Sequence, residues 1–167
     1  MDKTRIKILS IYALTGGAAL LGGIPTYMAQ NLCLSMILVT LILTYILRGM
    51  SKADSLEHHH FTFIIRSIWI YSFFASIGMI GASWMVYDKA DSSAVDTLLE
   101  QVNSGAIPSM ADLEAAEQRY LDTNMPLILE SVIMWMFPGL LYLLWRVARG
   151  SVRAFKNYRI LNIYSWL

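Results

Sequence analysis

Charged side chains are scarce in this sequence, and their absence is most complete near its start. Asp, Glu, Lys and Arg make up 15% of the 167 residues, whereas a soluble domain usually has roughly 25%. None of these four residue types occurs between Ile8 and Leu47. An uncharged stretch of that length excludes an ordinary soluble domain and predicts a chain that lies largely within a lipid bilayer.

Cysteine and catalytic motifs are also nearly missing. Cys33 is the only cysteine, so a disulfide or a CxxC metal site within one chain is excluded, and we expect a small buried apolar residue there. The sequence has no Gly-rich phosphate loop, no Ser-His-Asp arrangement at a suggestive spacing and no paired carboxylates within its apolar segments. We therefore predict that the protein is not an enzyme, has no cofactor and does not bind nucleic acid.

Four apolar segments are long enough to cross a bilayer, which needs roughly 20 helical residues. Gly22, Gly23 and Pro25 interrupt the first uncharged stretch and predict a tight turn between two helices. Because a second apolar run follows almost at once, we expect the first segment to be retained and not cleaved as a signal peptide. The prediction is an all-α, integral membrane four-helix bundle that forms one domain, residues 1–167. Its transmembrane helices are expected at about residues 6–28, 30–47, 64–87 and 126–145.

The basic residues predict how these helices are oriented. Eleven of the 13 Lys and Arg residues lie in or next to three regions: the segment before the first helix, the connection between the second and third, and the tail after the fourth. Only Lys89 and Arg119 lie in the connection between the third and fourth segments. Short basic loops stay in the cytoplasm. We therefore predict a multi-pass protein of the bacterial inner membrane with both termini cytoplasmic and residues 88–125 outside.

The external connection, residues 88–125, has eight acidic and two basic residues, which gives a net charge of −6. Its apolar residues recur at helical spacing, and Ser109 with Asp112 resembles a capping box. We predict two short amphipathic helices, followed by a fourth transmembrane helix with Pro126 in its first turn. The connection is either a solvated acidic loop on the bilayer surface or a docking surface for a partner subunit, since apolar stripes outside the membrane need cover. The predicted docking residues are Val95, Leu98, Leu99, Val102, Leu113 and Tyr120.

The cytoplasmic tail, residues 146–167, begins with a regular row of basic residues. At helical spacing these residues share one face beside the bilayer, where anionic headgroups attract each of them by about 1 kcal/mol. The predicted headgroup-binding residues are Arg146, Arg149, Arg153 and Lys156.

His58, His59 and His60 are the only histidines, and they are consecutive. Adjacent residues on a helix diverge by about 100°, so all three cannot converge on one metal ion. Two of them could bind a metal with help from Glu57 or from a second chain. No other histidine is available to ligate a haem from another helix of the same chain. We expect a polar cluster at the membrane interface and predict no metal site.

The segment from His60 to Trp69, His-Phe-Thr-Phe-Ile-Ile-Arg-Ser-Ile-Trp, resembles a segment in a family of small bacterial inner-membrane proteins of unknown function. The Trp-Arg-Val-Ala-Arg-Gly run that ends at Gly150, and the closing Ser-Trp-Leu, are similar to later patterns of that family. The family is grouped with Tic20-like four-helix membrane proteins. The resemblance implies a four-helix fold, no assigned reaction, and a packing motif at the cytoplasmic interface formed by His60, Arg66 and Trp69.

Small size, missing catalytic groups and a structured acidic cap favour a non-catalytic accessory or assembly subunit of a larger inner-membrane complex. Its expected partners are membrane lipids and other membrane protein subunits, and a homo-oligomer is also compatible with the sequence. One alternative is a self-assembling small channel or translocation component, for which the apolar segments offer only Ser, Thr and Tyr groups and a shallow Glu130. The other is a metal- or haem-binding redox subunit that uses His58 to His60.

Overall fold

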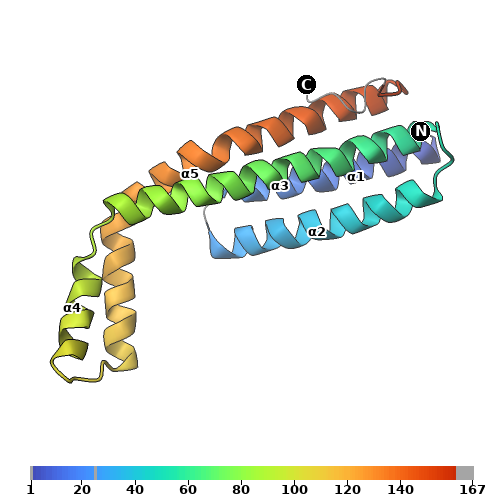
Figure 1. The fold of residues 1–167 in the computed structure, drawn as a ribbon. Coiled ribbons are helices and arrows are strands. Elements are labelled where there is room, and N and C mark those ends of the chain that lie inside the picture. The colour runs from blue at the N-terminus through green and yellow to red at the C-terminus, as the bar shows by residue number, and fades with distance from the viewer. Residues whose placement is uncertain (1, 25, 161–167) are drawn as a thin grey trace. The chain divides into compact units, whose positions relative to one another are not determined.

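The structure is a computed structural model, and it describes residues 2–24 and 26–160. The elements found in this part of the chain are all α-helices (Figure 1). Four of the helices, α1, α2, α3 and α5, are long and apolar enough to cross a membrane, as the sequence predicts. The five helices are α1 (Lys3–Gly22), α2 (Tyr27–Met50), α3 (Leu56–Lys89), α4 (Ser93–Asn103) and α5 (Met110–Phe155).

The turn between α1 and α2 follows Gly22, where the glycines predict it. The end of α1 is six residues earlier than expected, and Met28 already belongs to α2. The Thr26 side chain caps α2 by accepting a hydrogen bond from the Ala29 N–H at 3.3 Å. The Gln30 amide donates to the carbonyls of Gly22 at 3.0 Å and Ile24 at 2.9 Å. The first bond satisfies a carbonyl that the end of α1 leaves without a helical partner, and the second holds the turn that follows. Pro25 lies outside the described residues, as does the closing Ser-Trp-Leu of the tail.

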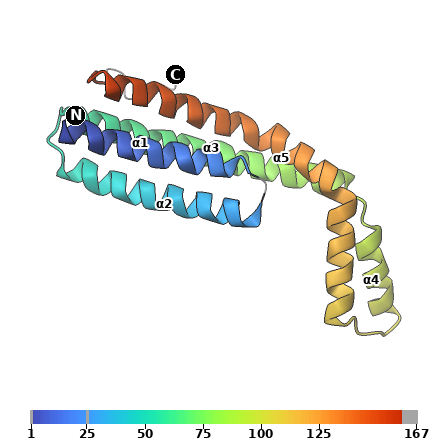
Figure 2. The same ribbon diagram turned by 180° about the vertical axis from the view of Figure 1, so that it is seen from behind.

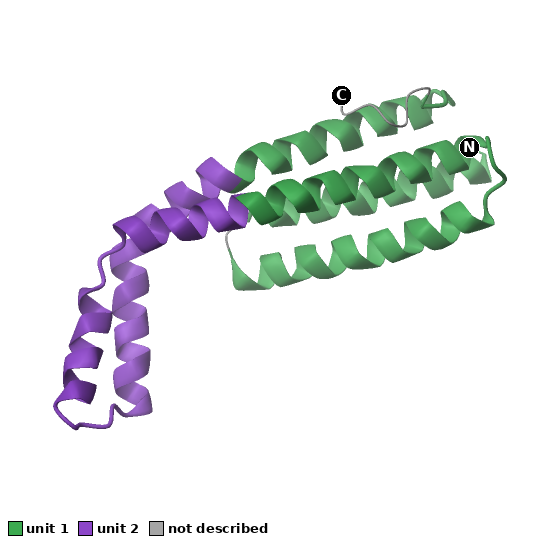
Figure 3. Cartoon of the chain, in the orientation of Figure 1, with its two compact units in different colours: residues 1–77, 136–167 green, residues 78–135 purple. Residues whose placement is uncertain are grey.

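The expectation of a separate helix that begins at Pro126 is wrong, because α5 is continuous from Met110 to Phe155. The capping box is confirmed: Ser109 Oγ donates to Asp112 at 2.6 Å, and the Asp112 N–H donates back to Ser109 Oγ at 3.2 Å. No glycine or proline stands between this cap and Pro126, so nothing ends the helix there. A proline inside a helix removes one hydrogen bond and bends the axis. Figure 3 shows α5 changing direction within the purple part of the chain, residues 78–135. Pro126 is the only proline of α5 in this part.

The chain divides into two compact units, coloured separately in Figure 3. Unit 1 comprises residues 1–77 and 136–167, and therefore holds α1, α2, the first part of α3 and the last part of α5. Unit 2 comprises residues 78–135, with the end of α3, all of α4 and the first part of α5. Within unit 2, α4 lies beside the first part of α5 in both views (Figures 1 and 2).

One face of α1 and one face of α3 supply most of the main buried cluster of unit 1. Ile8 and Tyr12 of α1 and Phe61, Ile64 and Ile68 of α3 are all almost completely buried in one apolar cluster. Their spacing follows the helical period, which places each set on a single face of its helix. Two members of this cluster, Tyr12 and Phe63, contact the polar groups described next.

Candidate functional site

Unit 1 contains a row of buried polar and aromatic side chains between α3 and α5. On α3 the row consists of His60, Phe63 and Ser67, spaced by three and four residues and therefore on one face. On α5 the residues at four-residue spacing are Tyr142, Arg146 and Gly150, and Tyr12 joins the row from α1. Gly150 is required here, because a Cβ atom at that position would overlap the Tyr12 ring.

Arg146 is the most unusual member of this row, since its side chain is 0% exposed within an apolar helix. Its Nε donates to Ser67 Oγ at 2.8 Å, and its Nη1 donates to the Tyr142 hydroxyl at 3.1 Å. The guanidinium carbon lies 4.0 Å from the centre of the Phe63 ring, a distance that gives a cation–π interaction. Two hydroxyls and an aromatic face therefore hold the buried cation in place.

His60 is also 0% exposed, and it links three segments of unit 1. One ring nitrogen, Nε2, lies 3.1 Å from the Tyr158 carbonyl oxygen, which can only accept, so Nε2 carries the proton. The other nitrogen, Nδ1, then accepts from the Tyr12 hydroxyl at 3.0 Å in the neutral imidazole. Through these two bonds His60 on α3 holds α1 and the segment that follows α5.

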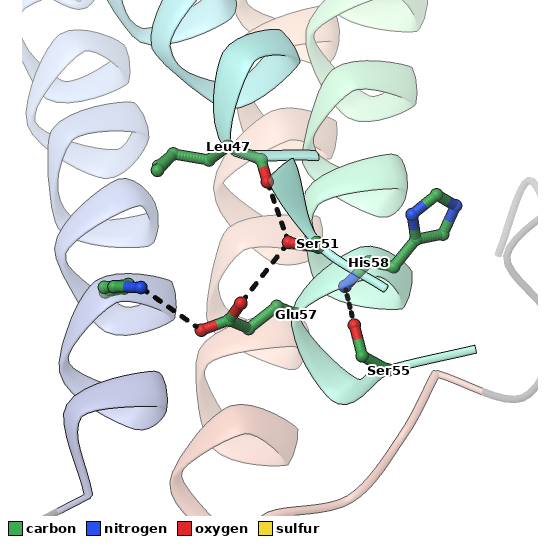
Figure 4. Close-up of polar contacts among 6 residues, drawn as sticks. Leu47, Ser51, Ser55, Glu57 and His58 are labelled. Atoms are coloured by element: carbon green, nitrogen blue, oxygen red, sulfur yellow. Dashed lines mark hydrogen bonds and ion pairs between the residues drawn. The ribbon is translucent and has the colours of Figure 1, made fainter. Parts of the chain in front are cut away.

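The other two histidines do not converge with His60. His59 Nδ1 donates to the Ile160 carbonyl at 3.2 Å, and its Nε2 lies 3.7 Å from the Asp54 carboxylate. Figure 4 shows the His58 ring directed away from Glu57. Within residues 2–24 and 26–160 no group of three or more His, Cys, Asp and Glu side chains is placed to hold a metal ion.

Glu57 takes part instead in the connection between α2 and α3 (Figure 4). The Ser51 hydroxyl lies 2.7 Å from the Leu47 carbonyl oxygen and 3.3 Å from Glu57 Oε2. The other Glu57 oxygen is 3.7 Å from Lys7 Nζ on α1. The backbone N–H of His58 donates to Ser55 Oγ at 3.2 Å, and this bond caps α3. The helix therefore begins at Leu56, eight residues before its predicted start. These contacts join the N-terminal end of α1 to the α2–α3 connection.

The three residues of the resemblance, His60, Arg66 and Trp69, occupy different environments. His60 is buried, Arg66 is half-buried and Trp69 is exposed. The Trp69 indole N–H donates to the Tyr45 hydroxyl at 3.1 Å and so ties α3 to α2. His60 and Trp69 each link helices. A packing motif of these three residues at the cytoplasmic interface stays a prediction.

The four residues predicted to bind lipid headgroups differ in how far they are buried on α5. Arg146 is enclosed by Phe63, Ser67 and Tyr142, so its guanidinium does not reach a lipid surface, contrary to the prediction. Arg149 and Arg153 are half-buried, and Lys156 is exposed. Headgroup binding by these last three residues stays a prediction.

In unit 2, residues 88–125, here called the acidic hairpin, carry the predicted docking residues. Val95, Leu99, Val102 and Leu113 are 42–54% exposed, whereas Leu98 and Tyr120 are half-buried. At the tip, Ile107 and Met110 are 96% and 72% exposed, and sequence reasoning did not single them out. Exposed apolar side chains thus extend from α4 around the tip of the acidic hairpin.

Asn124 fixes the base of the acidic hairpin, and sequence reasoning missed it. This side chain is buried, and its Oδ1 accepts from the Asp91 N–H at 2.8 Å. Its Nδ2 donates to the carbonyls of Asp91 at 3.0 Å and Tyr120 at 2.9 Å. Asp91 in turn accepts from the Ser93 N–H at 2.9 Å, which lowers the pKa of the Asp91 carboxyl and begins α4. The available signal was an asparagine amid apolar residues of an amphipathic helix.

A groove of about 410 Å³ opens in unit 2 between the end of α3 and α5. Its wall is mostly apolar, and its hydroxyl-bearing residues are Ser83, Tyr87, Tyr120 and Ser131. Close packing near this groove depends on Gly81, where a Cβ atom would overlap the Trp135 ring.

No family model, no curated protein and no solved structure matches this chain. The resemblance to the small inner-membrane family therefore stays a prediction that rests on the residues quoted for it.

Proposed function

We propose that this protein is a non-catalytic accessory or assembly subunit of a larger complex in the bacterial inner membrane, and that it docks through the acidic hairpin. The observation that carries the proposal is the exposed apolar stripe of α4, formed by Val95, Leu99 and Val102. Contiguous exposed apolar side chains are unfavourable in water and mark interaction sites. The stripe is thus a surface that a partner would cover.

The proposal includes an orientation in which both termini are cytoplasmic and the acidic hairpin is on the opposite side. The distribution of Lys and Arg along the chain supports it, because short connections rich in these residues resist translocation. The four candidate spans support it as well, since an even number of crossings returns the chain to the side where it starts.

The acidic hairpin is suited to docking because other residues anchor it while the stripe stays exposed. Asn124 holds Asp91, and Ala116 is buried on α5, whereas the stripe itself is exposed. A surface that is already ordered loses less conformational entropy when a partner binds, which favours affinity.

Affinity purification from the native host in mild detergent tests the proposal. The triple variant Val95→Ser, Leu99→Ser and Val102→Ser is expected to lose a stoichiometric partner that the parent retains, because each truncated contact costs roughly 1 kcal/mol or more. Thr97→Ala is the matched control, since Thr97 is exposed on the same helix about 200° away from Val95. This control should retain the partner.

A deletion of residues 92–122 provides the second arm of the test. The deleted protein should still insert its four apolar helices, because the deleted residues lie outside the predicted transmembrane segments. It should purify without the partner. Retention of the partner by both the deletion and the triple variant would show that the acidic hairpin does not dock it.

A further inference from the structure

The chemistry of α4 indicates what kind of partner the stripe fits. With about 100° between successive residues, Val95, Leu99 and Val102 fall within about 60° of one another. Ala94 and Leu98 are half-buried on one side of this stripe. On its other side Asp96 and Glu100, four residues apart and both exposed, form an acidic strip. The exposed surface of α4 is therefore apolar along one line and anionic beside it.

A bilayer surface is a poor occupant for this stripe. Helices that lie on membranes carry Lys and Arg on their polar face, which anionic headgroups attract. Between Ser93 and Asn103 α4 has two acidic residues and no basic one. The acidic hairpin as a whole has a net charge of −6, so anionic lipids would repel it.

A second copy of this chain is disfavoured for the same electrostatic reason. Pairing two stripes would bring two hairpins of net charge −6 together, and like charges across an interface oppose binding. A partner of opposite charge gains attraction in place of repulsion and is also steered toward the surface.

We infer that the stripe accepts a cationic amphipathic segment of another protein, with apolar residues at helical spacing flanked by Lys or Arg. The inference rests on the proposed docking function and specifies its partner. The apolar side chains of the segment cover Val95, Leu99 and Val102, while its basic residues face Asp96 and Glu100. Ile107 and Met110 extend the apolar contact at the tip of the acidic hairpin.

Peptide binding to the full-length protein in nanodiscs of zwitterionic lipid tests this inference. The probes are two amphipathic 18-residue helices, one of Leu and Lys and one of Leu and Glu, and empty nanodiscs supply the background. The Lys peptide should bind at least tenfold more tightly than the Glu peptide. Its affinity should fall severalfold when the salt concentration rises from about 0.05 to 0.5 M, since salt screens exposed charges.

Two variants separate the apolar contribution from the charged one. Val95→Ser with Leu99→Ser should weaken Lys-peptide binding about tenfold or more, because buried apolar contact is lost. Asp96→Asn with Glu100→Gln should weaken it severalfold and reduce its salt dependence. Thr97→Ala should leave the affinity unchanged.

Four results would overturn the inference: no binding of the Lys peptide, equal affinity for both peptides, Lys-peptide binding that neither double variant weakens, or a dimer whose formation requires the stripe residues. Peptide binding also separates this inference from the proposed function. If a native partner requires the stripe but the Lys peptide does not bind, the docking function stands and the cationic partner is wrong. If the peptide binds as expected but no native partner is lost from the triple variant, the docking function is wrong while the surface chemistry holds.

Discussion

Replacing Asn124 with alanine is expected to loosen the acidic hairpin while leaving unit 1 folded. Asn124 makes two hydrogen bonds to the backbone of Asp91, 33 residues earlier in the chain, and one to the Tyr120 carbonyl on its own helix. Only the first two hold the start of α4 against α5. The perturbation therefore removes a specific connection between two elements of unit 2.

The magnitude follows from the number of bonds lost. A hydrogen bond contributes about 0.5–1.5 kcal/mol net, so the two bonds to Asp91 contribute about 2 kcal/mol. Because Asp91 is exposed, water replaces the lost partner and no buried group is left without a hydrogen bond. A loss of about 2 kcal/mol raises the population of the open hairpin by roughly 30-fold.

Hydrogen–deuterium exchange of the protein in nanodiscs measures this population directly. Backbone amides of α4 should exchange roughly 30-fold faster in Asn124→Ala, while amides of α1 and α2 should be unchanged. Thr123→Ala is the control, because Thr123 is the exposed neighbour of Asn124 on the same helix. Exchange of α4 within about twofold of the parent would refute the assignment of Asn124 as the anchor. Equal acceleration in α1 would show that the change unfolds more than the acidic hairpin.

Three further predictions concern unit 1 and the orientation of the chain. Arg146→Lys should lower stability by about 2 kcal/mol in thermal unfolding, because a lysine ammonium cannot bond Ser67 and Tyr142 while stacking on Phe63. Arg149→Lys, at a half-buried position where the guanidinium lies 5.2 Å from the centre of the Trp145 ring, should change stability by less than about 1 kcal/mol. Gly150→Ala should cost about 1–3 kcal/mol, because its Cβ overlaps Tyr12, whereas Gly49→Ala in open space should be neutral or slightly stabilising. A membrane-impermeant maleimide should label Ser104→Cys in intact cells stripped of their outer membrane and label Lys52→Cys only after permeabilisation; the opposite pattern would reverse the proposed orientation. The buried Cys33 should give little background in that assay.

The four helices that are long and apolar enough to cross a membrane could be predicted because their signal is local. The lack of charged residues over about 20 positions identifies α1, α2 and the apolar parts of α3 and α5, and glycine identifies the turn after Gly22. The capping box at Ser109 was also visible, since its two residues interact within one turn of helix. Each of these features depends on residues that are close in sequence, so no knowledge of tertiary structure is needed.

The burial of Arg146 could not be predicted from residues close to it in the sequence. The spacing of Arg146, Arg149 and Arg153 correctly places them toward one side of α5, but spacing does not tell how that helix is rotated against α3. The rotation is set by Phe63 and Ser67, more than 70 residues earlier, and by the space that Gly150 leaves for Tyr12. A pattern of basic residues near a membrane surface therefore predicted lipid contact for a residue that tertiary packing buries.

Pro126 shows a related limit. Proline is common in the first turn of a helix and also occurs within helices that bend, so its presence alone does not decide between a boundary and a bend. The deciding residues are those before it: from Met110 to Met125 there is neither glycine nor proline, and a capping box starts the helix at Ser109. The absence of a stop signal should have outweighed the single proline.

The acidic hairpin keeps its anchoring residues apart from its exposed ones, and this separation makes the docking proposal testable. Asn124 and Ala116 are buried and hold the acidic hairpin together, while Val95, Leu99 and Val102 are 42–54% exposed. Serine at the three exposed positions should therefore leave α4 exchange close to that of the parent, unlike alanine at Asn124. A variant that keeps its hairpin but loses its partner would then locate the binding energy in the stripe itself.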